Sequence, residues 1–131
     1  MKAEDIVSAF SEREVLDRVI CASEFEDMAC SIARLRESDQ LKLLPLLMAY
    51  VLDHQNDGWK TNYGEMIVFC LMPQPAGWAN LIDEMNALEI KATLKWLVSC
   101  NDFPFAVNCM DELRLAIEWF SERDGNHKLR K

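Results

Sequence analysis

Residues 39–54 read DQLKLLPLLMAYVLDH, and this stretch sets the architecture of the chain. Apolar residues fall on almost every side of a helix drawn through it, from Leu41 to Leu52. A helix that is apolar all round belongs in the centre of a domain, so we expect the rest of the chain to pack around it. Pro45 has to lie in the first turn of this helix or to kink it, because an interior proline removes a backbone hydrogen bond.

Apolar residues recur at helical intervals on both sides of this stretch. They predict further helices over about 3–10, 11–20, 23–35, 62–72, 77–88, 89–99 and 107–122. Ser11 with Glu14 and Ser23 with Glu26 each place a serine three residues before a glutamate, which is typical of a capped helix start. Residues 123–131 include three basic residues after position 127 and are expected to form a flexible basic tail.

The composition supports a single helical domain. The chain has 131 residues, half of them apolar, with four prolines and four glycines, too few for a turn-rich β domain. We therefore expect one all-α domain over residues 1–122, with six to eight short helices arranged as antiparallel hairpins. Residues 43–53, LLPLLMAYVLD, resemble the first helix of a HEAT-type repeat. The hairpins could form a compact bundle or a small HEAT-like α-solenoid.

The charge is strongly acidic. Fourteen basic and 22 acidic side chains give a formal net charge of -8. A negative charge of this size repels nucleic-acid phosphates and anionic membranes and attracts cationic surfaces. The alternative interpretation is that the charge only keeps the protein soluble. We expect no nucleic-acid or membrane partner.

The cysteines indicate a reducing compartment. Five of them, an odd number, lie in apolar stretches without a CxxC pair, so we expect buried, unpaired thiols. The N-terminal residues lack the apolar core of a signal peptide. The longest apolar run, residues 43–52, is too short to cross a membrane. These features predict a cytoplasmic protein.

No motif for a cofactor, a metal or a catalytic residue is present. Residues 53–58, DHQNDG, resemble the start of an EF-hand calcium loop, but Gln55 and Gly64 stand where that loop needs ligands. We interpret the stretch as a polar turn. The histidines, His54 and His127, have no cysteine at zinc-ligand spacing, and phosphate-binding glycine motifs are absent.

Two carboxylate pairs leave one enzymatic alternative open. Glu14 with Asp17, and Glu24 with Asp27, share a helix face at a spacing that can hold magnesium. The all-α nucleotide pyrophosphohydrolases use carboxylate pairs on two packed helices in this way. The alternative function is therefore a carboxylate-dependent nucleotide hydrolase.

The four tryptophans fall into two groups. Trp96 and Trp119 lie on apolar helix faces and are expected in the core. Trp59 and Trp78 each follow a glycine at the boundary of a predicted element. A large ring there either covers one end of the core or stands out from the surface, where it would suit a binding hot spot beside acidic residues.

Together these features favour a macromolecule-binding protein without catalytic activity. The best match is a small acidic immunity or inhibitor protein that neutralises a basic protein partner, such as a bacterial nuclease toxin. A helical adaptor that binds through apolar surface is the other non-enzymatic alternative. The residues predicted to bind the partner are Glu24, Glu26, Asp27, Asp53, Asp57, Trp59 and Trp78.

Overall fold

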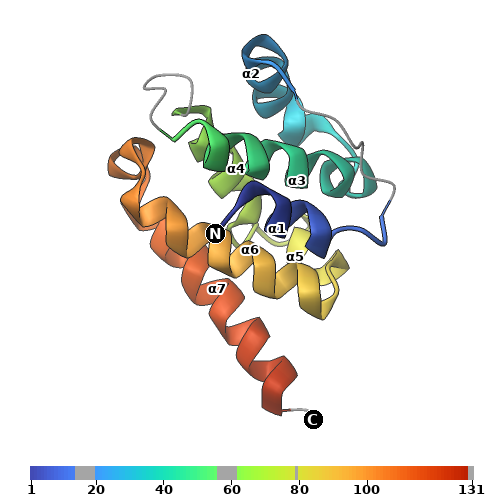
Figure 1. Ribbon diagram of the computed structural model, residues 1–131. Coiled ribbons are helices and arrows are strands. Elements are labelled where there is room, and N and C mark those ends of the chain that lie inside the picture. The colour runs from blue at the N-terminus through green and yellow to red at the C-terminus, as the bar shows by residue number, and fades with distance from the viewer. Residues whose placement is uncertain (14–19, 56–61, 79, 130–131) are drawn as a thin grey trace.

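The computed structural model describes residues 1–13, 20–55, 62–78 and 80–129 (Figure 1). Within these ranges every regular element is helical and no strand occurs, which confirms the predicted all-α fold. The α-helices are α1 (Ala3–Ala9), α2 (Ala22–Ser31), α3 (Glu37–Asp53), α4 (Gly64–Leu71), α5 (Leu81–Glu84), α6 (Ala87–Ser99) and α7 (Met110–Leu129). Short 3₁₀ helices cover η1 (Ile32–Arg34), η3 (Cys100–Asp102) and η4 (Pro104–Asn108).

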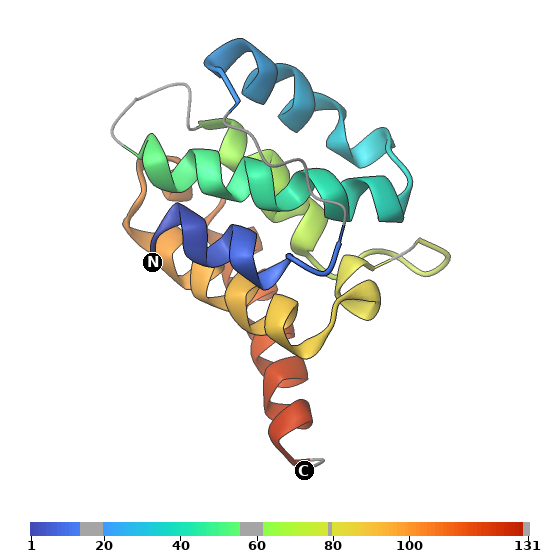
Figure 2. The same cartoon turned by 45° about the vertical axis from the view of Figure 1, so that its right-hand side comes forward.

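Helix α3 forms the centre, as its sequence predicts. It contacts α1 on one side and α2 and α4 on the other (Figures 1 and 2). Leu44, Leu47 and Val51 are completely buried. The helix begins at Glu37, so Pro45 lies in its interior and not in its first turn. Proline leaves the carbonyl group of Leu41 without its helical partner, but the buried ring contributes apolar packing in return.

The remaining helices pack around α3. Helix α1 lies between α3 and α6, and α7 packs against the other side of α6. Helix α2 and helix α4 contact each other and α3, and both run in the direction opposite to α3 (Figure 2). The predicted antiparallel hairpins are therefore present at α2–α3 and α3–α4. Trp96 is fully buried as predicted and donates its indole N–H to the Met48 carbonyl at 3.0 Å.

Helix α2 starts earlier than its sequence predicts. Cys21 and not Ser23 occupies the N-cap, and the backbone N–H of Cys21 donates to the Glu24 carboxylate at 3.3 Å. Glu24 thus takes the capping role that we assigned to Glu26. The helix predicted over 11–20, with its Ser11–Glu14 cap, cannot be compared because residues 14–19 lie outside the described part of the chain.

The helix predicted over 77–88 is wrong in extent. Among the described residues of this stretch, helix α5 covers Leu81–Glu84, and α6 begins separately at Ala87, two residues before the start predicted at 89. Asn86 explains the break, because its side chain accepts the backbone N–H of Glu89 at 2.9 Å while Glu89 accepts that of Asn86 at 2.9 Å. This reciprocal cap starts a new helix in the middle of the apolar stripe.

The last helix differs from its prediction at both ends. It starts at Met110, because residues Pro104–Asn108 form a 3₁₀ helix, and it continues to Leu129. The predicted end at residue 122 was therefore too early. The domain boundary at that residue and the flexibility of the basic tail stay predictions.

An ion pair between the partly exposed Arg13 and the buried Glu89 connects the turn after α1 to α6. Glu89 is completely buried, and its two carboxylate oxygens accept hydrogen bonds from Arg13 Nε and Nη2 at 2.5 and 2.8 Å. The same Nη2 donates to the carbonyl oxygen of Glu84 at 2.5 Å. These contacts satisfy the buried carboxylate and fix residues 11–13 against the α5–α6 junction.

Candidate functional site

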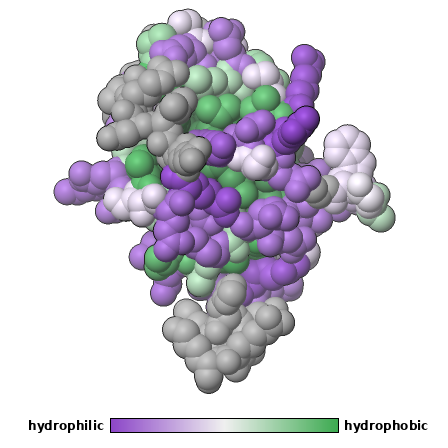
Figure 3. All heavy atoms as spheres, turned by 90° about the vertical axis from the view of Figure 1, so that its right-hand side faces the viewer, coloured by the Kyte–Doolittle hydropathy of each residue, from purple (hydrophilic) through white to green (hydrophobic). Residues whose placement is uncertain are grey.

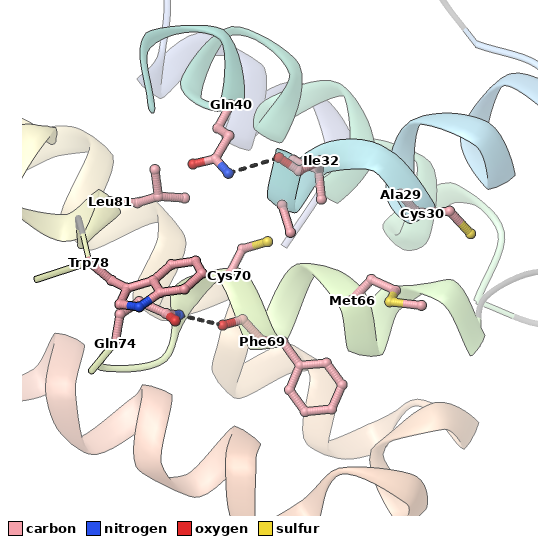
Figure 4. Close-up of a pocket in the computed structure, with 11 residues that line it drawn as sticks. Ala29, Cys30, Ile32, Gln40, Met66, Phe69, Cys70, Gln74, Trp78 and Leu81 are labelled. Carbon is pink, nitrogen blue, oxygen red and sulfur yellow. Dashed lines mark hydrogen bonds between the residues drawn. The ribbon is translucent and has the colours of Figure 1, made fainter. Parts of the chain in front are cut away.

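An apolar groove lies between α2 and α4 and is the candidate site (Figure 4). We call it the α2–α4 groove. Its volume is about 280 Å³, below the range of about 300–1,000 Å³ that is usual for small-molecule sites. The lining residues are Ala29, Cys30, Ile32 and Ala33 of α2 and η1, Gln40 of α3, Met66, Phe69 and Cys70 of α4, Gln74 and Trp78 of the following loop, and Leu81 of α5.

The groove is apolar because α4, apart from Glu65 in its first turn, has no charged residue. Its sequence is GEMIVFCL, and the core covers Ile67, Val68 and Leu71. Cys70 points from α4 toward α2 across the groove, whereas the exposed Phe69 ring lies on the side of α4 turned away from α2 (Figure 4). Met66 is exposed and lines the groove. Apolar side chains also reach the surface, bordered by polar ones, on the face seen in Figure 3. Exposed apolar residues that gather around one depression indicate a contact surface.

Trp78 stands at one end of the groove and is 68% exposed. Its backbone N–H donates to the Pro75 carbonyl at 3.0 Å and closes a turn. Gly77 in this turn has a φ of 90°, which disfavours any residue with a side chain. Of the two interpretations of Trp78, the structure agrees with a ring that stands out from the surface and not with one that covers the core. Trp59 lies outside the described residues.

Two glutamines hold the polar parts of the groove in place. Gln74 Nε2 donates to the carbonyl oxygens of Phe69 and Met72 at 2.8 and 3.1 Å, which secures the loop to the end of α4. Gln40 Nε2 donates to the Ile32 carbonyl at 2.8 Å, and its own carbonyl oxygen lies on the side of Leu81 (Figure 4). The Trp78 end of the groove therefore combines apolar groups with an amide acceptor.

The opposite end of the groove is acidic. Glu26 lies three residues before Ala29 and four before Cys30, so it shares their helix face. Its carboxylate accepts the hydroxyl hydrogen of Tyr63 at 2.8 Å, which joins α2 to the start of α4 and raises the pKa of Tyr63. Asp27 is exposed on the flank, three residues before Cys30. Helix α2 contains no basic residue.

The other predicted binding residues do not join this groove. Glu24 caps the start of α2 and lies on the helix face of Met28, away from the lining residues. Asp53 is the last residue of α3 and lines a separate recess beside Met1 and Lys2. Asp57 lies outside the described residues. Of the predicted set, Trp78 lines the groove, and Glu26 and Asp27 lie beside it on α2.

The apolar lining residues of the groove, above all Met66 and Phe69, were not predicted as binding residues. The sequence pattern predicted a helix over residues 62–72 and did not distinguish its faces. A helical wheel would have marked Met66, Phe69 and Cys70 as a separate face, but only the packing decides which apolar face stays uncovered.

A second apolar surface carries the opposite charge. Leu88 and Val98 of α6 are 67% and 50% exposed, and Lys91 and Lys95 lie between them. Together with Met1 they border a shallow depression between α1 and α6. We call this surface the α6 ridge. Its lysines do not suit a basic partner.

The cysteines differ from the prediction in part. Cys100 and Cys109 are buried as expected and Cys70 is half-buried, but Cys21 and Cys30 are exposed. Burial raises the pKa of Cys70 and of Cys109 to about 11 and that of Cys100 well above its usual value. A raised pKa keeps these three thiols protonated at neutral pH, so they are poor nucleophiles. All five cysteines, which the structure describes, are free.

Metal chemistry gains no support from the described residues. No three histidine, cysteine, aspartate or glutamate side chains among them come close enough to hold an ion. His54 stacks on the Tyr50 ring at 3.9 Å, and its Nδ1 hydrogen-bonds the Tyr50 carbonyl. The predicted pair Glu14 and Asp17, and most of the polar loop from Asn56 on, lie outside the described residues.

The helices in the described ranges are too short or too polar to cross a membrane. Comparison with known proteins gives no match to a protein-family model, a curated protein or a solved structure.

Proposed function

We propose that this chain is a protein-binding module that takes a partner with a basic surface at the α2–α4 groove. The observation that carries the proposal is the position of two exposed apolar side chains, Met66 and Trp78, at one groove, with Glu26 and Asp27 one helical turn before its lining residues Ala29 and Cys30. A large apolar anchor with a charged rim is the usual composition of a binding hot spot.

The charge supports a basic partner. The chain has a net charge of -8, so it attracts cationic proteins over long distances and accelerates their association. We propose, more narrowly, an immunity or inhibitor protein that neutralises a cationic target such as a nuclease toxin. Fast association is the property that an inhibitor of this kind needs. The free, exposed thiols Cys21 and Cys30 favour a reducing compartment, and we propose the cytoplasm.

A helical adaptor is the second candidate function. Exposure of Trp78 and Phe69 favours it, because apolar side chains alone can hold a partner without help from charge. The two functions differ in their response to salt. The affinity of an acidic inhibitor for a basic target falls as the salt concentration rises, whereas the affinity of a contact made through apolar surface alone does not.

Capture from a native extract on the immobilised full-length chain tests the proposal. We expect a basic protein that elutes as the salt concentration rises. Trp78→Ala should abolish its capture, whereas Leu88→Ala, at a side chain of nearly the same exposure on the α6 ridge, should retain it. Equal capture by both variants would contradict a role for the groove, and a partner that high salt leaves bound would favour the adaptor.

A matched pair of charge variants separates local charge from net charge. Glu26→Gln with Asp27→Asn removes the acidic end of the groove, and the amide oxygen introduced at position 26 can still accept the Tyr63 hydrogen bond. Asp102→Asn with Glu118→Gln removes two exposed carboxylates elsewhere. We expect only the first variant to lose about 5- to 30-fold in affinity at low salt.

A further inference from the structure

Given the proposed function, on which this inference rests, we propose that the occupant of the α2–α4 groove is one amphipathic α-helix of the partner. We further propose that this helix runs antiparallel to α2 and α4, with its basic C-terminal turn at Glu26 and Asp27.

The walls of the groove favour a helix. One wall is α2 with η1, the other is α4, and the two run in the same direction (Figures 2 and 4). Two helices side by side leave a furrow in which the ridge of a third helix can pack. An extended peptide that binds by strand addition would need the edge of a sheet, and the described chain has no strand. The small volume admits a few anchoring side chains and not a compact ligand.

The two ends of the groove carry different charges. Glu26 and Asp27 lie at the end where α2 and α4 begin, as the contact between Tyr63 and Glu26 indicates. Arg34 ends η1 at the other end, next to the lining residue Ala33. It is exposed, and no described contact occupies its guanidinium group. The groove therefore distinguishes the two ends of a charged helix.

This asymmetry fixes the direction of the occupant. Helices prefer lysine and arginine in their last turn and acidic residues in their first turn, because these charges oppose the helix dipole. The basic end of such a helix fits Glu26 and Asp27 when its C-terminus lies there. Its acidic first turn then lies near Arg34, and its apolar anchors meet the apolar lining of the groove. The partially positive N-termini of α2 and α4 also face its partially negative C-terminus.

Two synthetic peptides test the direction. Each has about 14 residues, the same composition and the same apolar stripe, and each is stapled to equal helicity with both ends blocked. One carries its two lysines in the last turn and the other carries them in the first turn. Binding is followed by fluorescence anisotropy of a dye on the solvent side of the peptide.

We expect the peptide with C-terminal lysines to bind about fivefold more tightly at low salt, as two partly screened ion pairs allow. The preference should disappear in Glu26→Gln with Asp27→Asn and persist in Asp102→Asn with Glu118→Gln.

Equal or reversed affinities of the two peptides would overturn the proposed direction of the helix but leave the proposed function standing, provided that Trp78→Ala still weakens binding of both peptides. If neither peptide binds while the chain still captures a basic protein through Trp78, the single-helix occupant is wrong. If extract capture is also indifferent to Trp78→Ala, the proposed function fails as well.

Discussion

At the scale of single residues, the ion pair between Arg13 and Glu89 has the clearest consequence for stability. Arg13→Ala removes the cation that faces a completely buried carboxylate and leaves the backbone N–H of Asn86 as its described hydrogen-bond donor. We expect the variant to lose about 3–5 kcal/mol of unfolding free energy, because an unpaired buried charge is costly. Urea denaturation measures this loss. The control, Arg114→Ala, removes an exposed contact of 3.7 Å to Asp111 and should cost less than about 1 kcal/mol. Similar losses in the two variants would contradict the assigned role of the pair.

Burial also sets the reactivity of the thiols. At pH 8 we expect iodoacetamide to modify Cys21 and Cys30 in the folded chain and to leave the other three cysteines unmodified. A pKa of about 11 leaves about one Cys70 thiol in a thousand ionised at pH 8, and the fraction rises as the pH approaches 11. Peptide mapping by mass spectrometry identifies the modified sites. Modification of buried Cys100 as fast as that of Cys21 would contradict the packing.

Within the helices, the start of α4 depends on a glycine. A Cβ atom on Gly64 would lie 2.7 Å from Cε1 of Phe105, whose ring is completely buried. Gly64→Ala should therefore destabilise the fold by about 1–3 kcal/mol although alanine is the better helix former. The thermal unfolding midpoint measures the effect. Adding Phe105→Leu should make the glycine substitution less costly, and a stabilising Gly64→Ala would contradict the close contact.

The elements also show how far local sequence patterns reach. The apolar stretch of α3 and the stripes of α4 and α6 predicted helices that the structure contains. The predicted helix boundaries were wrong where a capping side chain starts a helix within a continuous apolar stripe. The Asn86 cap starts α6 at Ala87, two residues before the predicted boundary between the helices over 77–88 and 89–99, and Glu24 caps α2 at Cys21 instead of Ser23. Apolar periodicity specifies which side of a helix is buried, but side-chain hydrogen bonds to the backbone decide where the helix begins.

At the scale of the whole molecule, the sequence predicted the fold class and only parts of the candidate site. Glu26, Asp27 and Trp78 were predicted to bind a partner because of residue type and local position. Their relation to one groove follows from the packing of α2 against α4, two helices that are separated in sequence by the whole of α3. A single sequence does not reveal which apolar face such packing leaves open, so Met66 and Phe69 were not among the predicted binding residues.

Occupation of the α2–α4 groove by the partner can be measured at Cys30. This thiol lines the groove, whereas Cys21 is exposed outside it, so the unmodified chain contains both a probe and a control. The rate of iodoacetamide modification at each thiol is measured with and without the captured basic partner. We predict that the partner slows modification of Cys30 at least about tenfold and leaves Cys21 unchanged. An unchanged rate at Cys30 in the fully formed complex would show that the partner binds elsewhere.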